Sequence, residues 1–115
     1  MGSLSQGERT MQSTSQVLQA ARALVALGWT QGPYLRRQPH GPDCYCAVGA
    51  VAQASGADMA ACAFPEFHRG AFAALNAAAR QLAGQHSALE YNETPGRTQA
   101  DVLRLFDVAL ELASK

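Results

Sequence analysis

The sequence carries no net charge, few aromatic residues and no long hydrophobic run. Nine basic residues balance nine acidic ones in a chain of 115 residues, and aromatic residues make up 7%. This balance argues against a broad electrostatic surface for nucleic acid or anionic lipid, so a nucleic-acid partner is not favoured. No apolar stretch approaches the ~20 residues of a membrane-spanning helix, and a membrane partner is therefore not expected.

The sequence also lacks the apolar segment of a secretory signal near its first residue. Its cysteines are odd in number, and Cys44 and Cys46 lie too close together along the chain to bridge comfortably. Reduced thiols are typical of the cytosol, so we expect a cytoplasmic protein. We interpret residues 1–12 as a flexible N-terminal arm or a cloning remnant, and residues 13–115 as a single domain.

Alanine is the commonest residue, and apolar residues recur at helical spacing in four segments. The sequence predicts a mainly α, single small domain of about four packed helices, with a short irregular or β-like segment near 33–43. The first helix is expected from Ser13 to a left-handed stop at Gly28, and the second from Asp43 or Cys44 to Ser55, with Asp43 as N-cap and Gly56 beyond the end. The third is expected from Phe67 to Leu82 before a stop at Gly84, and the fourth from Gln99 to Ala113. Ser13 and Thr98 are each followed, three residues later, by a side chain that can complete a capping box.

Small side chains are expected to let these helices pack closely. Glycine at position 49 costs about 1 kcal/mol of helix propensity against alanine, so Gly49 indicates a close crossing by another backbone. The alanine-rich faces could pack within one chain or between two chains, which leaves a homodimer open.

The two segments that join the helices are predicted to be irregular. Residues 34–37 could form a short strand in the first, and residues 89–91 are expected to be briefly extended in the second, which spans 85–97. Three aromatic side chains are expected to close the core near these loops with their polar tips in solvent: Trp29, Tyr45 and Tyr91.

Cys46 is a candidate nucleophile. It is predicted to lie near the N-terminus of the second helix, where unpaired N–H groups and the helix dipole lower the pKa of a thiol. His40 or His86 could act as its base, and Asn92 could orient that base in the Cys–His–Asn order of papain-like enzymes. The alternative is a packed, inert thiol, because free cysteine is among the most buried residue types.

A second interpretation of the cysteines is metal binding. Five residues form the pattern H-x3-C-x-C-x15-C-x5-H: His40, Cys44, Cys46, Cys62 and His68. Four of them could surround zinc tetrahedrally. The C-x-C pair is not the C-x2-C pair of zinc fingers, so we favour packed cysteines and expect neither a metal nor another cofactor.

One local cluster of basic residues stands out. Arg36 and Arg37 follow Tyr34 and precede His40, whereas the other arginines are scattered along the chain. A phosphate-binding protein concentrates its charge on one face. A solvated loop is therefore the favoured interpretation of this cluster.

Polar side chains flank a Pro-Gly turn in the segment 90–98: Glu90, Asn92, Glu93 and Arg97. Such a loop could hold Arg97 ready to pair with a carboxylate or a phosphate. In the structural alternative, which we favour, Asn92 bonds backbone groups of the loop and Thr98 caps the next helix.

Three strings resemble the blocks of a family of small bacterial and phage proteins of unknown function: LGWTQG (27–32), YCAVGAV (45–51) and YNETPGRTQADVLRLFDVA (91–109). The resemblance covers almost all of residues 15–113 and supports a single domain. In that family an aromatic residue precedes the cysteine, as Tyr45 precedes Cys46 here. A Trp-Asn-Asp triplet precedes the Gly-Arg-Thr turn, where this chain has Tyr-Asn-Glu at 91–93. The resemblance brings no activity with it, and the occurrence of the family in phage-type genomes implies a role in host takeover or anti-defence.

The sequence contains no phosphate loop, nucleotide fingerprint or acid/base pair at workable spacing. We therefore expect a small cytosolic binding, adaptor or regulatory protein without catalytic activity, which contacts a protein partner through loops 29–43 and 85–97. The expected binding residues are Trp29, Tyr34, Arg36, Arg37, His40, Tyr45, Tyr91, Asn92, Glu93 and Arg97. The alternative is a small cysteine-dependent enzyme that uses Cys46.

Overall fold

Five helices and one short β-hairpin make up the part of the chain that the computed structural model describes, residues 13–56 and 68–114. In chain order they are α2 (Thr14–Leu27), β1 (Leu35–Arg36), β2 (Cys44–Tyr45), α3 (Ala47–Ala54), α4 (Arg69–Ala83), α5 (Ala88–Glu93) and α6 (Gln99–Ala113). The predicted mainly α, single small domain is confirmed. The expected arm at 1–12, residue Phe67 and the cysteine Cys62 lie outside the described residues.

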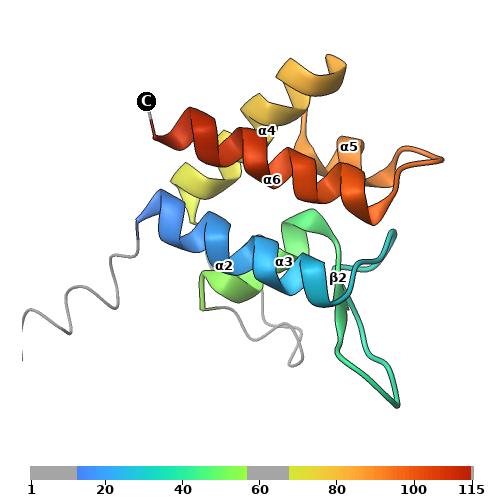
Figure 1. Ribbon diagram of the computed structural model, residues 1–115. Coiled ribbons are helices and arrows are strands. Elements are labelled where there is room, and N and C mark those ends of the chain that lie inside the picture. Colours follow the sequence, from blue (N-terminus) through green and yellow to red (C-terminus); the bar gives the residue numbers. More distant parts are fainter. Residues whose placement is uncertain (1–12, 57–67, 115) are drawn as a thin grey trace, which may run out of the picture.

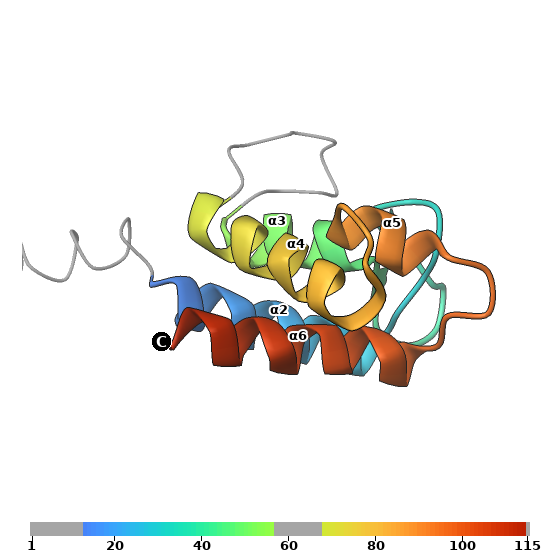
Figure 2. The ribbon, with the colours of Figure 1, turned by 90° about the horizontal axis from the view of Figure 1, so that it is seen from above.

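The helices form two layers. The long helices α2 and α6 lie side by side in one layer, and α3, α4 and α5 form the other (Figures 1 and 2). Arg22 of α2 pairs with Asp107 of α6, Nε to Oδ1 at 2.8 Å. About one turn further along α2, the Gln99 side-chain amide donates to the Val25 carbonyl at 2.7 Å. These two ties fix α2 and α6 antiparallel, and the second satisfies a carbonyl in the last turn of α2.

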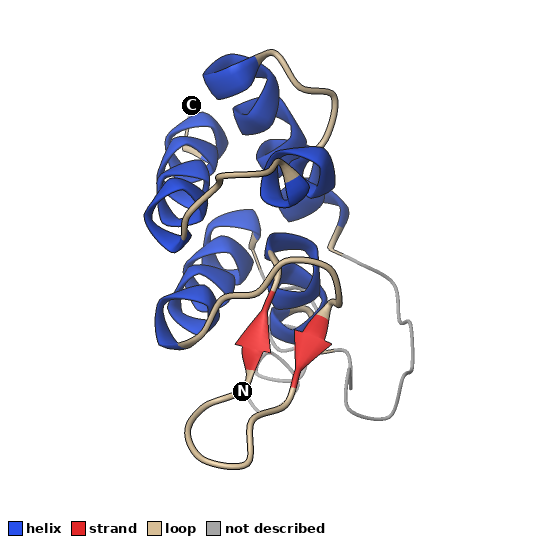
Figure 3. Ribbon diagram, turned by 90° about the vertical axis from the view of Figure 1, so that its right-hand side faces the viewer, coloured by secondary structure: helices blue, strands red, loops and turns tan. Residues whose placement is uncertain are grey.

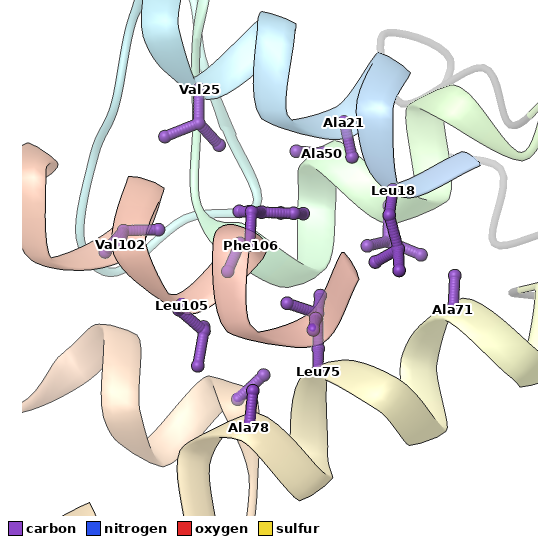
Figure 4. Packing of buried hydrophobic residues seen from close by; sticks show 14 of the residues in the cluster. Leu18, Ala21, Val25, Ala50, Ala71, Leu75, Ala78, Val102, Leu105 and Phe106 are labelled. Carbon is purple, nitrogen blue, oxygen red and sulfur yellow. The ribbon is translucent and has the colours of Figure 1, made fainter. Parts of the chain in front are cut away.

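The core between the layers is made largely of small side chains, as predicted. Phe106 is the largest fully buried side chain among the described residues and extends from α6 toward α2. Leu105, at the preceding position of α6, points toward α4 (Figure 4). Alanines fill the facing positions of the other helices: Ala21, Ala50, Ala71 and Ala78, all 0% exposed. Within the described residues, no helix has both the length and the apolar character needed to cross a membrane.

The helix ends follow local sequence signals in most places. Ser13 and Thr98 each form the predicted capping box with the side chain three residues on. Gly84 ends α4 in the left-handed conformation, with φ at 67°. Gly56 has φ at 103° just beyond α3, as its predicted place after that helix requires.

The predicted left-handed stop at Gly28 is wrong. Gly28 is extended, with φ at −169°, because the chain continues directly into a bridge between Trp29 and Tyr45. A side chain at position 28 would meet the backbone carbonyl of Asp43. Glycine is therefore required here by a close backbone approach rather than by a turn.

The predicted start of the second helix is also wrong. Cys46, rather than Asp43, is the N-cap of α3, and its thiol accepts from the Gly49 N–H at 3.3 Å. The helix starts later because Cys44 and Tyr45 pair with β1 instead. Tertiary pairing has overridden the local capping preference of an aspartate.

The segment that we expected to be extended at 89–91 is helical. Ser87 caps α5 by accepting from the Glu90 N–H at 3.1 Å, and the Glu90 carboxylate accepts from the His86 N–H at 2.9 Å. This reciprocal pair resembles a capping box and starts a short helix where the turn-rich composition predicted a loop. The described residues therefore hold five helices where the sequence predicted about four.

The hairpin confirms the predicted short strand within 34–37. β1 pairs antiparallel with β2, with Leu35 opposite Tyr45 and Arg36 opposite Cys44 (Figure 3). The Tyr34 carbonyl accepts from the Cys46 N–H and lies directly against Gly49 of α3. The close backbone crossing that Gly49 predicted is confirmed, and it holds the hairpin on α3.

Replacing Gly49 with alanine tests this crossing. The new Cβ would overlap the backbone carbonyl of Tyr34, which cannot move aside as the tip of a side chain can. Overpacking of this kind costs about 1–3 kcal/mol and outweighs the roughly 1 kcal/mol gained in helix propensity. We expect the free energy of unfolding to fall by about 1 kcal/mol in urea denaturation.

The exposed position Gln81 on α4 supplies the control, because alanine there meets no such backbone. The variant Gln81→Ala should unfold at the urea concentration of the parent. A Gly49→Ala protein as stable as the parent would contradict the crossing.

Candidate functional site

The buried side chain of Asn92 joins three segments that are far apart in the sequence. Asn92 lies in α5 and is 0% exposed. Its Oδ1 accepts from the Trp29 indole Nε1–H at 2.8 Å and from the Ala47 N–H, in the first turn of α3, at 3.0 Å. Its Nδ2 donates to the Thr30 carbonyl at 3.3 Å. One amide therefore binds the segment after α2, the start of α3 and α5 together.

The neighbours of Asn92 strengthen the same junction. The Glu93 carboxylate accepts from the Asn92 amide at 2.7 Å and from the Gly32 N–H at 2.7 Å. The Gln31 side-chain amide donates to the carbonyls of Asn92, at 2.9 Å, and Thr94, at 3.0 Å. We call the interacting residues the Asn92 cluster: Trp29, Thr30, Gln31, Gly32, Ala47, Asn92, Glu93 and Thr94.

Arg97 is half-buried at the edge of this cluster. Its Nε donates to the Tyr91 carbonyl at 2.9 Å, and its Nη2 donates to Gln85 Oε1 at 3.1 Å. The guanidinium also lies 3.8 Å from the centroid of the Tyr91 ring, a cation–π contact. Arg97 thus orders the turn before α6 through bonds within the chain.

The three aromatic residues pack where the sequence placed them, near the loops at the edge of the core. The polar tips of two of them, however, are not left to solvent. Trp29 donates to Asn92, and the Tyr91 hydroxyl donates to the Asp101 carbonyl at 3.2 Å. Burial raises the pKa of Tyr91 and of Tyr45, with Arg97 and Arg37 respectively acting against the shift. Each ring is therefore neutral at physiological pH.

Cys46 does not have the environment of a nucleophile. Its side chain is 0% exposed, and burial raises the pKa of its thiol despite hydrogen bonds from the backbone of α3. The expected lowering of this pKa by the helix N-terminus is therefore wrong, because desolvation of the thiolate is the larger effect. The expected partner Asn92 bonds Trp29, Ala47, Thr30 and Glu93 rather than a histidine, and His86 is exposed on the surface.

The proposed metal ligands are not gathered into a site by the described residues. Within 13–56 and 68–114, no group of three or more His, Cys, Asp or Glu side chains is placed to hold a metal ion. His68 is instead the N-cap of α4, where its Nδ1 accepts from the Ala71 N–H at 3.1 Å. The Cys44 sulfur accepts from the Gln38 amide at 3.1 Å.

The basic residues of the first loop lie on the surface. The hairpin loop, residues 37–43, extends beyond the ends of the helices and is the most projecting part of this end of the molecule (Figures 1 and 3). Arg36, Arg37 and His40 are all exposed, whereas Tyr34 is half-buried against Ala52 of α3. Gln38 closes the loop by donating to the Pro42 carbonyl at 2.9 Å. The loop is therefore held by a hydrogen bond between its own residues.

A family model described as a family of unknown function (DUF6197) matches residues 9–112. The chain belongs to this family. No curated protein matches the chain, and no solved structure matches it either. The resemblance found in the sequence is thereby confirmed at the level of the family. Residues of the three strings 27–32, 45–51 and 91–109 meet at the Asn92 cluster.

Several residues in the cluster or bonded to it were missed by the reasoning from sequence. Gln31, Gln85 and Thr94 were not singled out, although Gln31 stands in the first block and Thr94 in the third. The signal that could have identified them is a polar side chain within or near one of the three strings. Nothing in the sequence alone shows that Gln31 reaches the backbone of residues more than sixty positions away.

Replacing Asn92 with alanine should weaken the whole junction. The change leaves the Ala47 N–H and the Trp29 indole without their acceptor, and an unsatisfied buried donor costs about 1–3 kcal/mol. We expect the free energy of unfolding to fall by about 3 kcal/mol, measured by urea denaturation with circular dichroism.

Asn76 of α4 is a matched control, because its Oδ1 accepts a single backbone bond, from the Ala88 N–H at 2.8 Å. The variant Asn76→Ala should lose roughly half as much stability. Equal losses in the two variants would show that Asn92 is an ordinary loop residue and not a junction.

The two described cysteines should differ in reactivity. The half-buried Cys44 should be alkylated by iodoacetamide at least about tenfold faster than the buried Cys46 in the native protein, because the thiolate is the reacting form and burial disfavours it. Peptide mass spectrometry of samples alkylated between about pH 5 and 9 measures both rates. Rapid modification of native Cys46 near pH 6 would contradict this assignment.

Proposed function

We propose that this protein is a non-catalytic protein-binding module that contacts its partner through the basic end of the hairpin. The residues in direct contact are Arg36, Arg37 and His40. The partner surface is acidic, because it must neutralise charges for which the described part of the chain supplies no ion pair.

The contrast between two sets of polar residues carries this proposal. Asn92, Glu93 and Arg97, which the sequence offered as binding residues, are bonded to other groups of the same chain. The side chains of Arg36 and Arg37, by comparison, make no hydrogen bond or ion pair with any residue in the described part of the chain, and both are exposed. Two adjacent charged side chains that could contact a partner therefore lie on the hairpin.

The shape of the hairpin loop supports the same function. Gln38 holds the loop closed, and Gly49 lets the Tyr34 backbone sit against α3. An ordered loop loses less conformational entropy when a partner binds, which favours affinity. A cytoplasmic location, a homodimer and a link to phage or other mobile elements stay predictions.

The alternative of a cysteine-dependent enzyme has little support. The thiol of Cys46 is buried, its pKa is raised, and its hydrogen-bond donor is the Gly49 N–H rather than a histidine. A thiol in this position caps a helix. We therefore place Cys46 among the structural residues of the domain.

Charge reversal on the hairpin tests the proposed function. Affinity capture from the native source is compared for the parent and for Arg36→Glu combined with Arg37→Glu. We expect the variant to lose the proteins that the parent captures, because two favourable charge contacts become repulsive.

A control with the same change in charge uses Arg69→Glu combined with Arg80→Glu, both exposed on α4. These two substitutions lie at opposite ends of the helix, so their effects on the helix dipole oppose each other. The control should capture the same proteins as the parent. The proposal fails if the hairpin variant retains those proteins, or if both double variants lose them equally.

A further inference from the structure

The outer edge of the hairpin carries backbone groups that have no partner among the described residues. The Tyr45 N–H donates to the Gly28 carbonyl at 2.9 Å, and the Tyr45 carbonyl accepts from the Thr30 N–H at 3.1 Å. The backbone groups of Tyr45 therefore face the Trp29 segment and not β1. Because these groups alternate in direction along a strand, Cys44 and Cys46 are the residues of this segment that bond β1.

The register then fixes the direction of the groups on β1. Leu35 lies opposite Tyr45, so the two form a non-hydrogen-bonded pair, and Arg36 opposite Cys44 forms a hydrogen-bonded pair. The N–H and C=O of Leu35 consequently point away from β2. In the described part of the chain neither group has a hydrogen-bond partner. β1 is thus an open edge strand.

The side chains of β1 give this edge two different faces. Leu35 is half-buried and packs against the core and Ala52, whereas Arg36 on the opposite face is exposed. Arg37 follows it and is exposed as well. A strand laid beside β1 would therefore present every second side chain to positive charge and the alternate side chains to small apolar groups of α3.

We propose that the partner docks as an extended, acidic segment that adds a strand to β1 and pairs with the backbone of Leu35. This inference rests on the proposed function and names the chemistry of its partner. The backbone bonds supply affinity, and acidic side chains opposite Arg36 and Arg37 supply specificity. The edge fits a polypeptide better than a nucleic acid, because an N–H and a C=O on one residue complement another peptide backbone, and the chain has no net positive charge.

The probe is a short peptide of alternating threonine and glutamate, blocked at both ends. Amide hydrogen exchange of the full chain is followed by NMR with and without this peptide. We expect exchange at the Leu35 N–H to slow by at least about tenfold when the peptide binds, because a hydrogen-bonded amide exchanges only after local opening. The Arg36 N–H is the internal control, since it already faces Cys44 and should change little.

Three matched ligands make the result decisive. The same peptide with alternate amide nitrogens methylated, and one with lysine in place of glutamate, should both fail to protect Leu35. A single-stranded oligonucleotide of similar charge should not protect it either. The variant Arg36→Glu combined with Arg37→Glu should abolish protection by the threonine–glutamate peptide.

Two results would overturn strand addition while leaving the proposed function standing. The first is binding of the acidic peptide with unchanged exchange at Leu35, which shows contact through charge alone. The second is no binding of the peptide while affinity capture still depends on Arg36 and Arg37. Preferential binding of the oligonucleotide would overturn both proposals, as would lysine-peptide binding equal to that of the acidic peptide.

Discussion

The amide of Asn92 is the group on which the loop-bearing end of this molecule depends. Its oxygen receives two donors, from Trp29 and Ala47, and its nitrogen reaches the carbonyl of Thr30. A fully buried amide must find such partners, since each unsatisfied group carries a large desolvation cost. Within the described residues no buried side-chain nitrogen or oxygen lacks a partner. The short helix α5 is held by this network as much as by apolar packing.

The two ends of the domain are stabilised in different ways. Over most of its length the chain packs small side chains between two layers of helices, around a few larger ones such as Phe106. Near the loops, hydrogen bonds between polar groups stabilise the chain. Residues that the sequence offered as candidate chemical sites form these intramolecular contacts. Cys46 caps α3, and Arg97 lies over Tyr91. The hairpin is attached to this rigid end, which explains how two exposed arginines can be presented in a defined position.

Reasoning from the sequence failed where a distant segment competes with a local signal. Asp43 is a good N-cap residue, yet pairing of Cys44 and Tyr45 with β1 delays the helix by several residues. Gly28 follows a helix, as left-handed stops do, but its neighbours draw it into extended backbone. The pKa of Cys46 was expected to fall at a helix terminus, and burial reverses the direction. In each case the deciding group lies in another part of the chain.

The sequence by itself determined the class of the fold, the start of α2, the stop after α4, both ends of α6, the short strand and the close approach at Gly49. These follow from helical periodicity, capping residues and glycine, all of which act over a few neighbouring residues. Only the tertiary structure decided that Asn92 is a junction, that the Arg97 side chain is bonded within the chain and that β1 has an open edge among the described residues. The Asn92 junction depends on donors and acceptors that meet across more than sixty residues of chain, and local preferences carry no record of such encounters.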